Sequence, residues 1–119
     1  MNNEKYPLVY IATPYSSDPV RNTQNAIAVA EMLEQEHRVY VVVPHLTHLW
    51  DLISPAPHEK WLERDIAVMR RCDAVVRFPG ASKGADLEVE YAKAAGIPVF
   101  IWGDKREEIA FGAWRDRIG

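Results

Sequence analysis

Short apolar runs alternate along the chain with longer stretches in which apolar residues recur at the spacing of a helix. The runs are rich in Val, Ile, Tyr and Phe, residues that favour β-strands. The pattern predicts strands at residues 8–12, 38–43, 73–78 and 97–102, and helices at residues 18–35, 58–71, 84–95 and 105–117. Such alternation is typical of a parallel sheet covered by helices.

Residues at the element ends support several of these boundaries. Asp18 followed by Pro19 is a typical N-cap with a first-turn proline, and Gly96 is well placed to end the helix before it. Residues 45–57 are the least regular stretch, for which we expect one short helical turn and a loop with two prolines.

Length and composition limit the fold to one core. The chain has 119 residues, too few for a second independent core, and 48% of them are hydrophobic. We therefore expect a single α/β domain over residues 1–119. Its architecture would be a Rossmann-like three-layer sandwich with a mainly parallel sheet of four to five strands.

The charge pattern argues against several partners. Fourteen basic and 17 acidic residues give a net charge of -3 without a dense basic run, so no nucleic-acid polymer is expected as partner. Cys72 is the single cysteine, which leaves no intramolecular disulfide and no cysteine-based metal cluster. Without an apolar stretch of membrane-spanning length or a signal region at residues 1–5, we expect a soluble cytoplasmic protein and no membrane partner.

The expected site lies where the strand-to-helix loops meet, at the carboxyl edge of the sheet. These loops are residues 13–18, 45–57 and 79–83. The last one leads into a helix through Ser82 and Gly84, which could form an anion cradle or only a helix cap. Candidate ligand contacts on the loops are Thr13, Pro14, Tyr15, His45, Ser82 and Gly84.

Two carboxylates fall on the apolar faces of their predicted helices. Successive residues placed 100° apart put Glu88 between Tyr91, Ala92 and Ala95, whereas Asp86 and Glu90 face solvent. Asp65 likewise falls near the centre of the apolar arc of helix 58–71. Burying a carboxylate costs several kcal/mol unless something compensates, so each marks either a functional group or a structural cap or ion pair.

A metal site is an alternative use of the second loop. His45, His48 and Asp51 stand at helix-like spacings in the segment PHLTHLWD. Zinc-binding motifs usually have a more distinctive spacing of ligands. We therefore expect these residues to form hydrogen bonds to a ligand, or only to pack the loop. No metal and no cofactor are expected.

The segment DIAVMRRCDAVVRFPGASKGADLEVEYAKAAGIPVF resembles the core of nucleoside 2-deoxyribosyltransferases and of nucleoside 5′-monophosphate N-glycosidases. In that superfamily an aspartate on a helix precedes an aspartate that starts a strand, followed by a G-x-x-x-E-x-x-x-A helix. Here the two aspartates are Asp65 and Asp73, and the helix carries Glu88. The opening VYIATPYSSD also resembles the first strand of the family, with Tyr10 on its tyrosine. Uncharacterised bacterial and phage families share the ATPY…PH…CD…S-x-GA…E pattern, and the resemblance as a whole covers residues 9–101.

The resemblance implies roles for the site residues. Glu88 falls on the catalytic glutamate, and Asp65 on an aspartate that contacts the nucleobase. Ser82 falls where the transferases have a sugar-binding aspartate and the nucleotide hydrolases a serine that contacts the 5′-phosphate, which favours a monophosphate. One departure is Thr13-Pro14-Tyr15-Ser16 in place of a Gly-Ser-x-Arg phosphate loop, leaving Arg21 or Lys83 to replace the arginine.

By this resemblance we expect cleavage of the N-glycosidic bond of a nucleoside or nucleoside 5′-monophosphate, by hydrolysis or by deoxyribosyl transfer. Glu88 would attack the anomeric carbon, and a protonated Asp65 could donate to the leaving base. The resemblance and the four tryptophans also indicate a homo-oligomer, a dimer or larger. The alternative is a non-catalytic nucleotide-binding or sensing module of the same fold.

Overall fold

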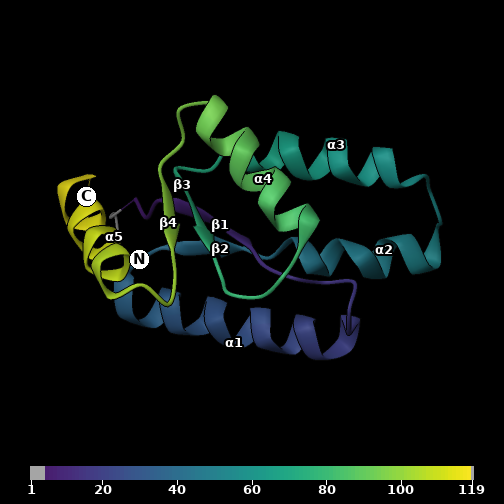
Figure 1. Ribbon diagram of the computed structural model, residues 1–119, viewed down its shortest axis with the longest axis horizontal. Helices are drawn as coiled ribbons and strands as arrows, with labels where there is room; N and C mark the ends of the chain where they lie inside the picture. Colours follow the sequence, from purple (N-terminus) through teal and green to yellow (C-terminus); the bar gives the residue numbers. More distant parts are fainter. Residues whose placement is uncertain (1–4, 119) are drawn as a thin grey trace.

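The sheet has the predicted parallel arrangement. The computed structural model describes residues 5–118, which contain one sheet of four parallel strands (Figure 1). The strands are β1 (Leu8–Ala12), β2 (Tyr40–Val42), β3 (Ala74–Arg77) and β4 (Val99–Ile101). Their order is β2-β1-β3-β4. The chain adds β2 on one side of β1 and then β3 and β4 on the other, which places the topological switch point between β1 and β3. In open α/β sheets, ligands bind at the carboxyl edge of such a switch point.

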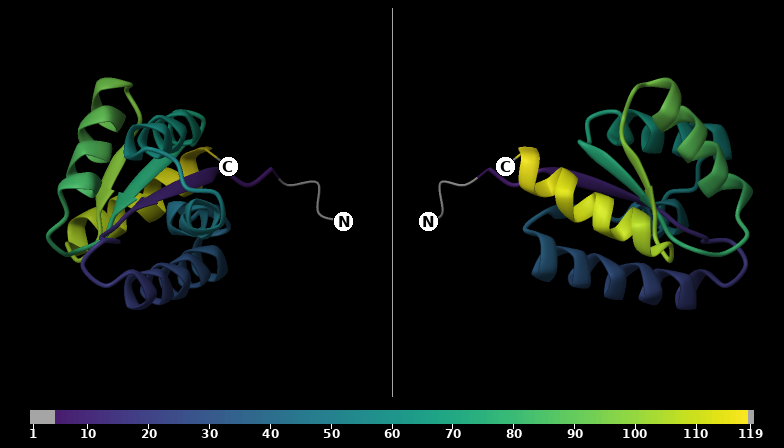
Figure 2. Two further views of the ribbon diagram at one scale, coloured as in Figure 1. Left: turned by 90° about the vertical axis from the view of Figure 1, so that its right-hand side faces the viewer. Right: turned by 60° about the vertical axis from the view of Figure 1, so that its left-hand side comes forward.

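Helices cover both faces of the sheet. The α-helices are α1 (Pro19–His37), α2 (Thr47–Ile53), α3 (His58–Met69), α4 (Lys83–Ala94) and α5 (Lys105–Ile118), and a 3₁₀-helix η1 (Pro44–Leu46) precedes α2. The views in Figures 1 and 2 show α1 and α5 on one face and α3 and α4 on the other. The expected three-layer α/β sandwich is thereby confirmed.

The alternation of β1 side chains explains the two cores. Val9 and Ile11 pack into a cluster that α1 and α5 complete with residues such as Leu33 and Phe111. Tyr10 and Ala12 point the other way and pack against α3 and α4. Because successive side chains of a strand face opposite sides, one continuous apolar run serves both layers. The face towards α4 therefore carries a buried tyrosine.

Some element boundaries differ from the expected ones. The second strand begins at Tyr40 instead of residue 38, because Arg38 adopts a left-handed conformation (φ 53°) at the end of α1. Residues 45–57 are more helical than expected: η1 and the seven-residue α2 fill the segment where one short turn was predicted. Gly96 has the expected positive φ of 75° just after α4.

Within residues 5–118, no helix is long and apolar enough to span a membrane.

Candidate active site

A cavity of about 680 Å³ opens at the carboxyl edge of the sheet. Its walls come from the loops after β1 and β3, from η1, α2 and α3, and from the start of α4. This combination follows from the topology, since β1 and β3 are the neighbouring strands at the switch point. The lining residues are Thr13, Tyr15, Ser16, Pro44, His45, His48, Asp51, Ala56, His58, Trp61, Leu62, Asp65, Ala81, Ser82, Lys83, Gly84, Ala85 and Glu88.

The Glu88 carboxylate is fixed by a hydrogen bond from the phenol of Tyr10. The Tyr10 side chain is completely buried, and its hydroxyl donates a hydrogen bond to Glu88 Oε2. Burial raises the pKa of Glu88 to about 7, with the Asp65 charge adding to the rise and the Tyr10 bond and Arg77 opposing it. Burial and the charge of Glu88 also raise the pKa of Tyr10, so the phenol keeps its proton. The arrangement fixes one carboxylate oxygen and leaves Oε1 without a hydrogen bond from Tyr10.

Asp65 reaches the same cavity from α3. Its side chain is half-buried, and burial raises its pKa to about 6, while Arg64 and His58 lower it. Two carboxyl groups with raised pKa values therefore share one cavity, and each exchanges protons within about one unit of neutral pH. This is the property that acid–base catalysis requires.

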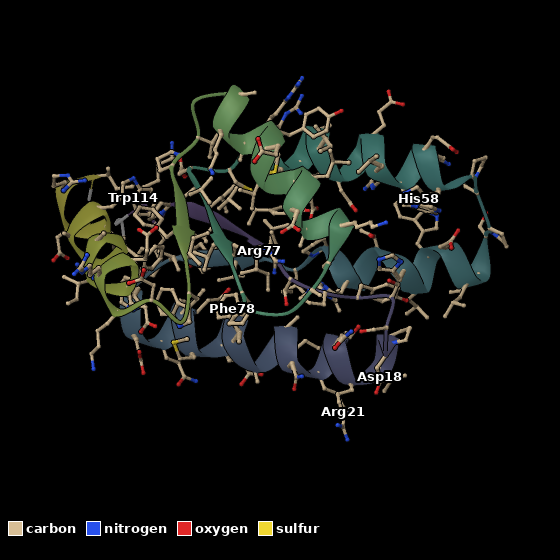
Figure 3. All side chains as sticks on the ribbon, viewed as in Figure 1. Asp18, Arg21, His58, Arg77, Phe78 and Trp114 are labelled. Atoms are coloured by element: carbon tan, nitrogen blue, oxygen red, sulfur yellow. The ribbon has the colours of Figure 1, made fainter. Side chains whose placement is uncertain are left out.

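The start of α4 forms the polar end of the cavity. Ser82 Oγ caps the helix by accepting from the Ala85 backbone N–H at 3.1 Å, which leaves the serine hydroxyl hydrogen as a donor. At Gly84 an added Cβ would meet only Ser82 Oγ, at 3.9 Å, so the helix start is open. Of the two cations considered as phosphate ligands, Lys83 lines the cavity, whereas Arg21 projects from the outer side of α1 (Figure 3). A helix N-terminus with a hydroxyl and a lysine is suited to an anion.

An aromatic wall closes another side of the cavity. The Tyr15 and His48 rings stack with centroids 3.5 Å apart, and Tyr15 meets His45 edge-on. His45 Nε2 lies 2.9 Å from Pro14 O, and because a carbonyl only accepts, this nitrogen carries the hydrogen. Burial lowers the pKa of both histidines, which favours the neutral form of each imidazole. Pro14 thus supports the wall and does not itself line the large cavity.

The metal alternative finds no support in the described part of the chain. No group of three His, Cys, Asp or Glu side chains within residues 5–118 is arranged to hold a metal ion. Asp51 instead accepts from the Trp61 indole N–H at 2.6 Å and from the Ala56 backbone N–H at 3.1 Å. Through these two hydrogen bonds, Asp51 joins α2 to the start of α3.

The structure adds residues that the sequence did not single out. His58 and Trp61 line the cavity on the first turn of α3, before Asp65 (Figure 3 labels His58). His58 and Asp65 are seven residues apart, a spacing that returns to the same helix face. That spacing could have identified His58 once Asp65 had been chosen.

Residues 7–102 match the family described as "Domain of unknown function (DUF7768)". No curated protein matches the sequence. Solved structures share the fold. One of them, a 2-desoxiribosyltransferase from Leishmania mexicana, superposes with a TM-score of 0.60 at 24% identity over 80% of this chain and 63% of that chain.

Another is a 2-deoxyribosyltransferase from Bacillus psychrosaccharolyticus. It gives a TM-score of 0.56 at 15% identity over 79% of this chain and 70% of that chain. The present chain thus spans less than two thirds of the Leishmania protein and somewhat more of the bacterial one. The chain belongs to the DUF7768 family and has the fold of the 2-deoxyribosyltransferases.

Proposed function

We propose that the protein cleaves the N-glycosidic bond of a nucleoside or nucleoside 5′-monophosphate, with Glu88 as nucleophile. The observation that carries the proposal is the Glu88 carboxylate, fixed by buried Tyr10 at the wall of a cavity at the sheet switch point. The cavity volume of about 680 Å³ is within the range of small-molecule sites. The shared fold with two 2-deoxyribosyltransferases supports the same chemistry.

The reaction proceeds in two displacements. Glu88 Oε1 attacks the anomeric carbon, the bond from that carbon to the base breaks, and the base leaves with the electron pair. Asp65 gives its proton to the departing base. Water, or a second base, then attacks the anomeric carbon and gives a proton to the Asp65 carboxylate, while the bond to Glu88 breaks and releases its carboxylate, which yields hydrolysis or transfer. Tyr10 supports both steps by holding Oε2 in place, since a shifted carboxylate would lose its alignment.

The preferred substrate in this proposal is a 5′-monophosphate, because Ser82, Lys83 and the start of α4 form a cradle for an anion. Base release measured by chromatography is expected to be faster from each monophosphate than from its nucleoside. Ser82→Asp adds a negative charge at the cradle and should reverse this preference, by roughly 10- to 100-fold, the worth of one charge-assisted hydrogen bond.

The same panel tests the proposed activity. Each substrate is assayed with and without an acceptor base, which separates transfer from hydrolysis. Ser54→Asp is the matched control, because Ser54 is exposed after α2 and outside the cavity, and it should leave the preference unchanged. Tight binding of a monophosphate without base release from any substrate would contradict the proposed activity and favour a non-catalytic nucleotide-binding module.

We also propose that the protein assembles with copies of itself. Two of the four tryptophans, Trp61 and Trp114, are buried and so are not available for an interface. The support for assembly comes instead from α2, which contains no buried residue. Its exposed apolar side chains include Leu49, Leu52 and Ile53, between 63% and 77% exposed. Because such a patch favours association, light scattering should give the mass of a dimer or larger, and Leu52→Asp with Ile53→Asp should lower it. A monomer for the wild type would reject the assembly.

A further inference from the structure

Arg77 is an unusual residue for the end of a buried parallel strand. It pairs with Ala12 in the register of β1 and β3, so it lies on the same sheet face as Tyr10, which pairs with Val75. Its side chain is only 11% exposed and lies between β3 and α4 (Figure 3). A charged side chain is seldom buried to this degree unless it is paired.

The guanidinium group of Arg77 binds the loop between β3 and α4. It donates to the carbonyl oxygens of Phe78 and Gly80, the second at 2.8 Å. It also donates to Asp86 Oδ1 at 3.1 Å, on the first turn of α4. One side chain thus ties together the end of β3, the following loop and the beginning of the helix that carries Glu88.

The loop that Arg77 holds fits closely against the opposite loop of the cavity. Gly80 has a φ of 123°, and a Cβ on it would lie 2.7 Å from Pro14 Cγ. The loop continues into Ala81 and Ser82, which line the cavity. The positions of Ser82 and of the helix start therefore depend on how the two carbonyls at the beginning of the loop are held.

Arg77 does not itself face the proposed substrate. It lines a separate shallow groove between α4 and β4, together with Asp86 and Ile101, and is not among the residues that line the large cavity. Three acceptors already bind its guanidinium group. A direct role as phosphate ligand is therefore disfavoured, although the residue lies close to the groups that perform the chemistry.

We propose that Arg77 is a positioning residue, which sets the geometry of the Pro79–Ser82 loop and of Glu88 by holding Phe78 O, Gly80 O and Asp86. The proposal rests on the proposed function for its effect on rate. It assigns no substrate contact to Arg77. The positive charge of Arg77 also lowers the pKa of Glu88, so the same residue keeps more of the nucleophile ionised at neutral pH.

The test compares Arg77→Met with Arg77→Lys in the full chain. Arg77→Met should lower kcat for base release by roughly 10- to 100-fold, the effect of a small misplacement of catalytic groups, and should raise KM. The pKa of Glu88 in the pH–rate profile of this variant should rise, because the positive charge beside Glu88 is lost. Arg77→Lys keeps the charge but can reach fewer acceptors, so its kcat should lie between those of the wild type and Arg77→Met.

Two controls separate positioning from charge and from general damage. Asp86→Asn keeps an acceptor oxygen for Arg77 and removes only the charge of the exposed Asp86, so kcat should stay within about twofold of the wild type. Arg70→Met removes an exposed arginine after α3 and should change nothing. Wild-type kcat, KM and pH midpoint in Arg77→Met would overturn the proposal. If Arg77→Met does not fold, Arg77→Lys decides: reduced kcat supports the proposal and wild-type values overturn it.

Two further readouts work without turnover. The carboxyl titration of Glu88 is followed by infrared difference spectra against Glu88→Gln, and backbone hydrogen exchange is followed over residues 78–85. Arg77→Met should raise the Glu88 midpoint and speed exchange in this loop. If the wild type releases no base, the proposed function fails, yet these readouts still decide on Arg77, since unchanged spectra and exchange would reject it.

Discussion

Glu88→Gln is expected to abolish base release while leaving the fold and substrate binding intact. An amide is no nucleophile towards the anomeric carbon, whereas its oxygen can still accept the hydrogen bond from Tyr10. Loss of a nucleophile typically lowers kcat by roughly 10⁴-fold or more, so release should fall to the limit of chromatographic detection. Binding of the monophosphate, measured by calorimetry, should remain.

A stability measurement tests whether the half-buried Glu88 is the acid with the raised pKa. The folded-state pKa of Glu88 lies near 7, above its ordinary value of 4.5, so its ionised form destabilises the fold at pH above about 7. Glu88→Gln removes this charge and should raise Tm relative to the wild type at pH 8. The difference should shrink as the pH falls below the folded-state pKa. Glu90→Gln, on the exposed side of α4, should leave both rate and Tm unchanged, and a matching loss of rate there would argue against a specific role for Glu88.

Asp65→Asn is expected to lower the rate by roughly 10²- to 10⁴-fold, the usual contribution of a positioned acid. In the wild type, the pair of Asp65 and Glu88 titrates with pKa values near 6 and 7. The proposed reaction needs one proton on the pair, so the profile of kcat/KM should be bell-shaped with its maximum between these values. Below the maximum both carboxyl groups are protonated, and above it both are ionised. Because Glu88 has the higher pKa, the single proton lies mostly on Glu88, and the reactive form with the proton on Asp65 is the minor one.

The variant changes the shape of this profile as well as its height. Asparagine has no proton to lose in this range, so the alkaline limb should disappear. The charge of Asp65 raises the pKa of Glu88, so the single limb that remains in the variant should have its midpoint below 7. Glu63→Gln, exposed on the same helix, serves as control. An alkaline limb that persists in Asp65→Asn would mean that another group protonates the base.

Much of the fold could be predicted because local patterns and tertiary packing agree. The first strand was predicted to the residue, since its apolar run is long enough to be buried on both faces. The end of α4 followed from Gly96, whose positive φ few other residues adopt readily. The second strand was predicted too long, because nothing in the sequence marks Arg38 as a left-handed helix cap.

The segment before α3 was the main error in the predicted secondary structure. The sequence of α2, THLWDLI, places its four apolar residues on one side of a helix, but seven residues are too few to establish a helical period. Its helix depends on contacts outside its own pattern, such as the Thr47 hydroxyl bond to Pro44 O and the bonds of Asp51 to Ala56 and Trp61. Such tertiary bonds are not visible in a single sequence.

The candidate site could be predicted only in part, for a similar reason. Glu88 and Asp65 were identifiable because a charge on an apolar helix face breaks a local pattern. The bond between Glu88 and Tyr10 joins residues 78 positions apart, and an apolar strand contains a tyrosine for many reasons. Arg77 could have been noticed as a charge inside a buried strand, but its three acceptors depend on a loop conformation that no sequence pattern shows.

The most direct test of the account is the chemical identity of the trapped enzyme. A substrate with fluorine at C2′ slows both displacements, because each builds positive charge on the anomeric carbon, and so favours accumulation of the intermediate. Mass spectrometry of the protein after incubation should then show one added fluorosugar, on the peptide that contains Glu88, and none in Glu88→Gln. Base release that proceeds without any adduct on that peptide, or an adduct on a different residue, would contradict Glu88 as the nucleophile.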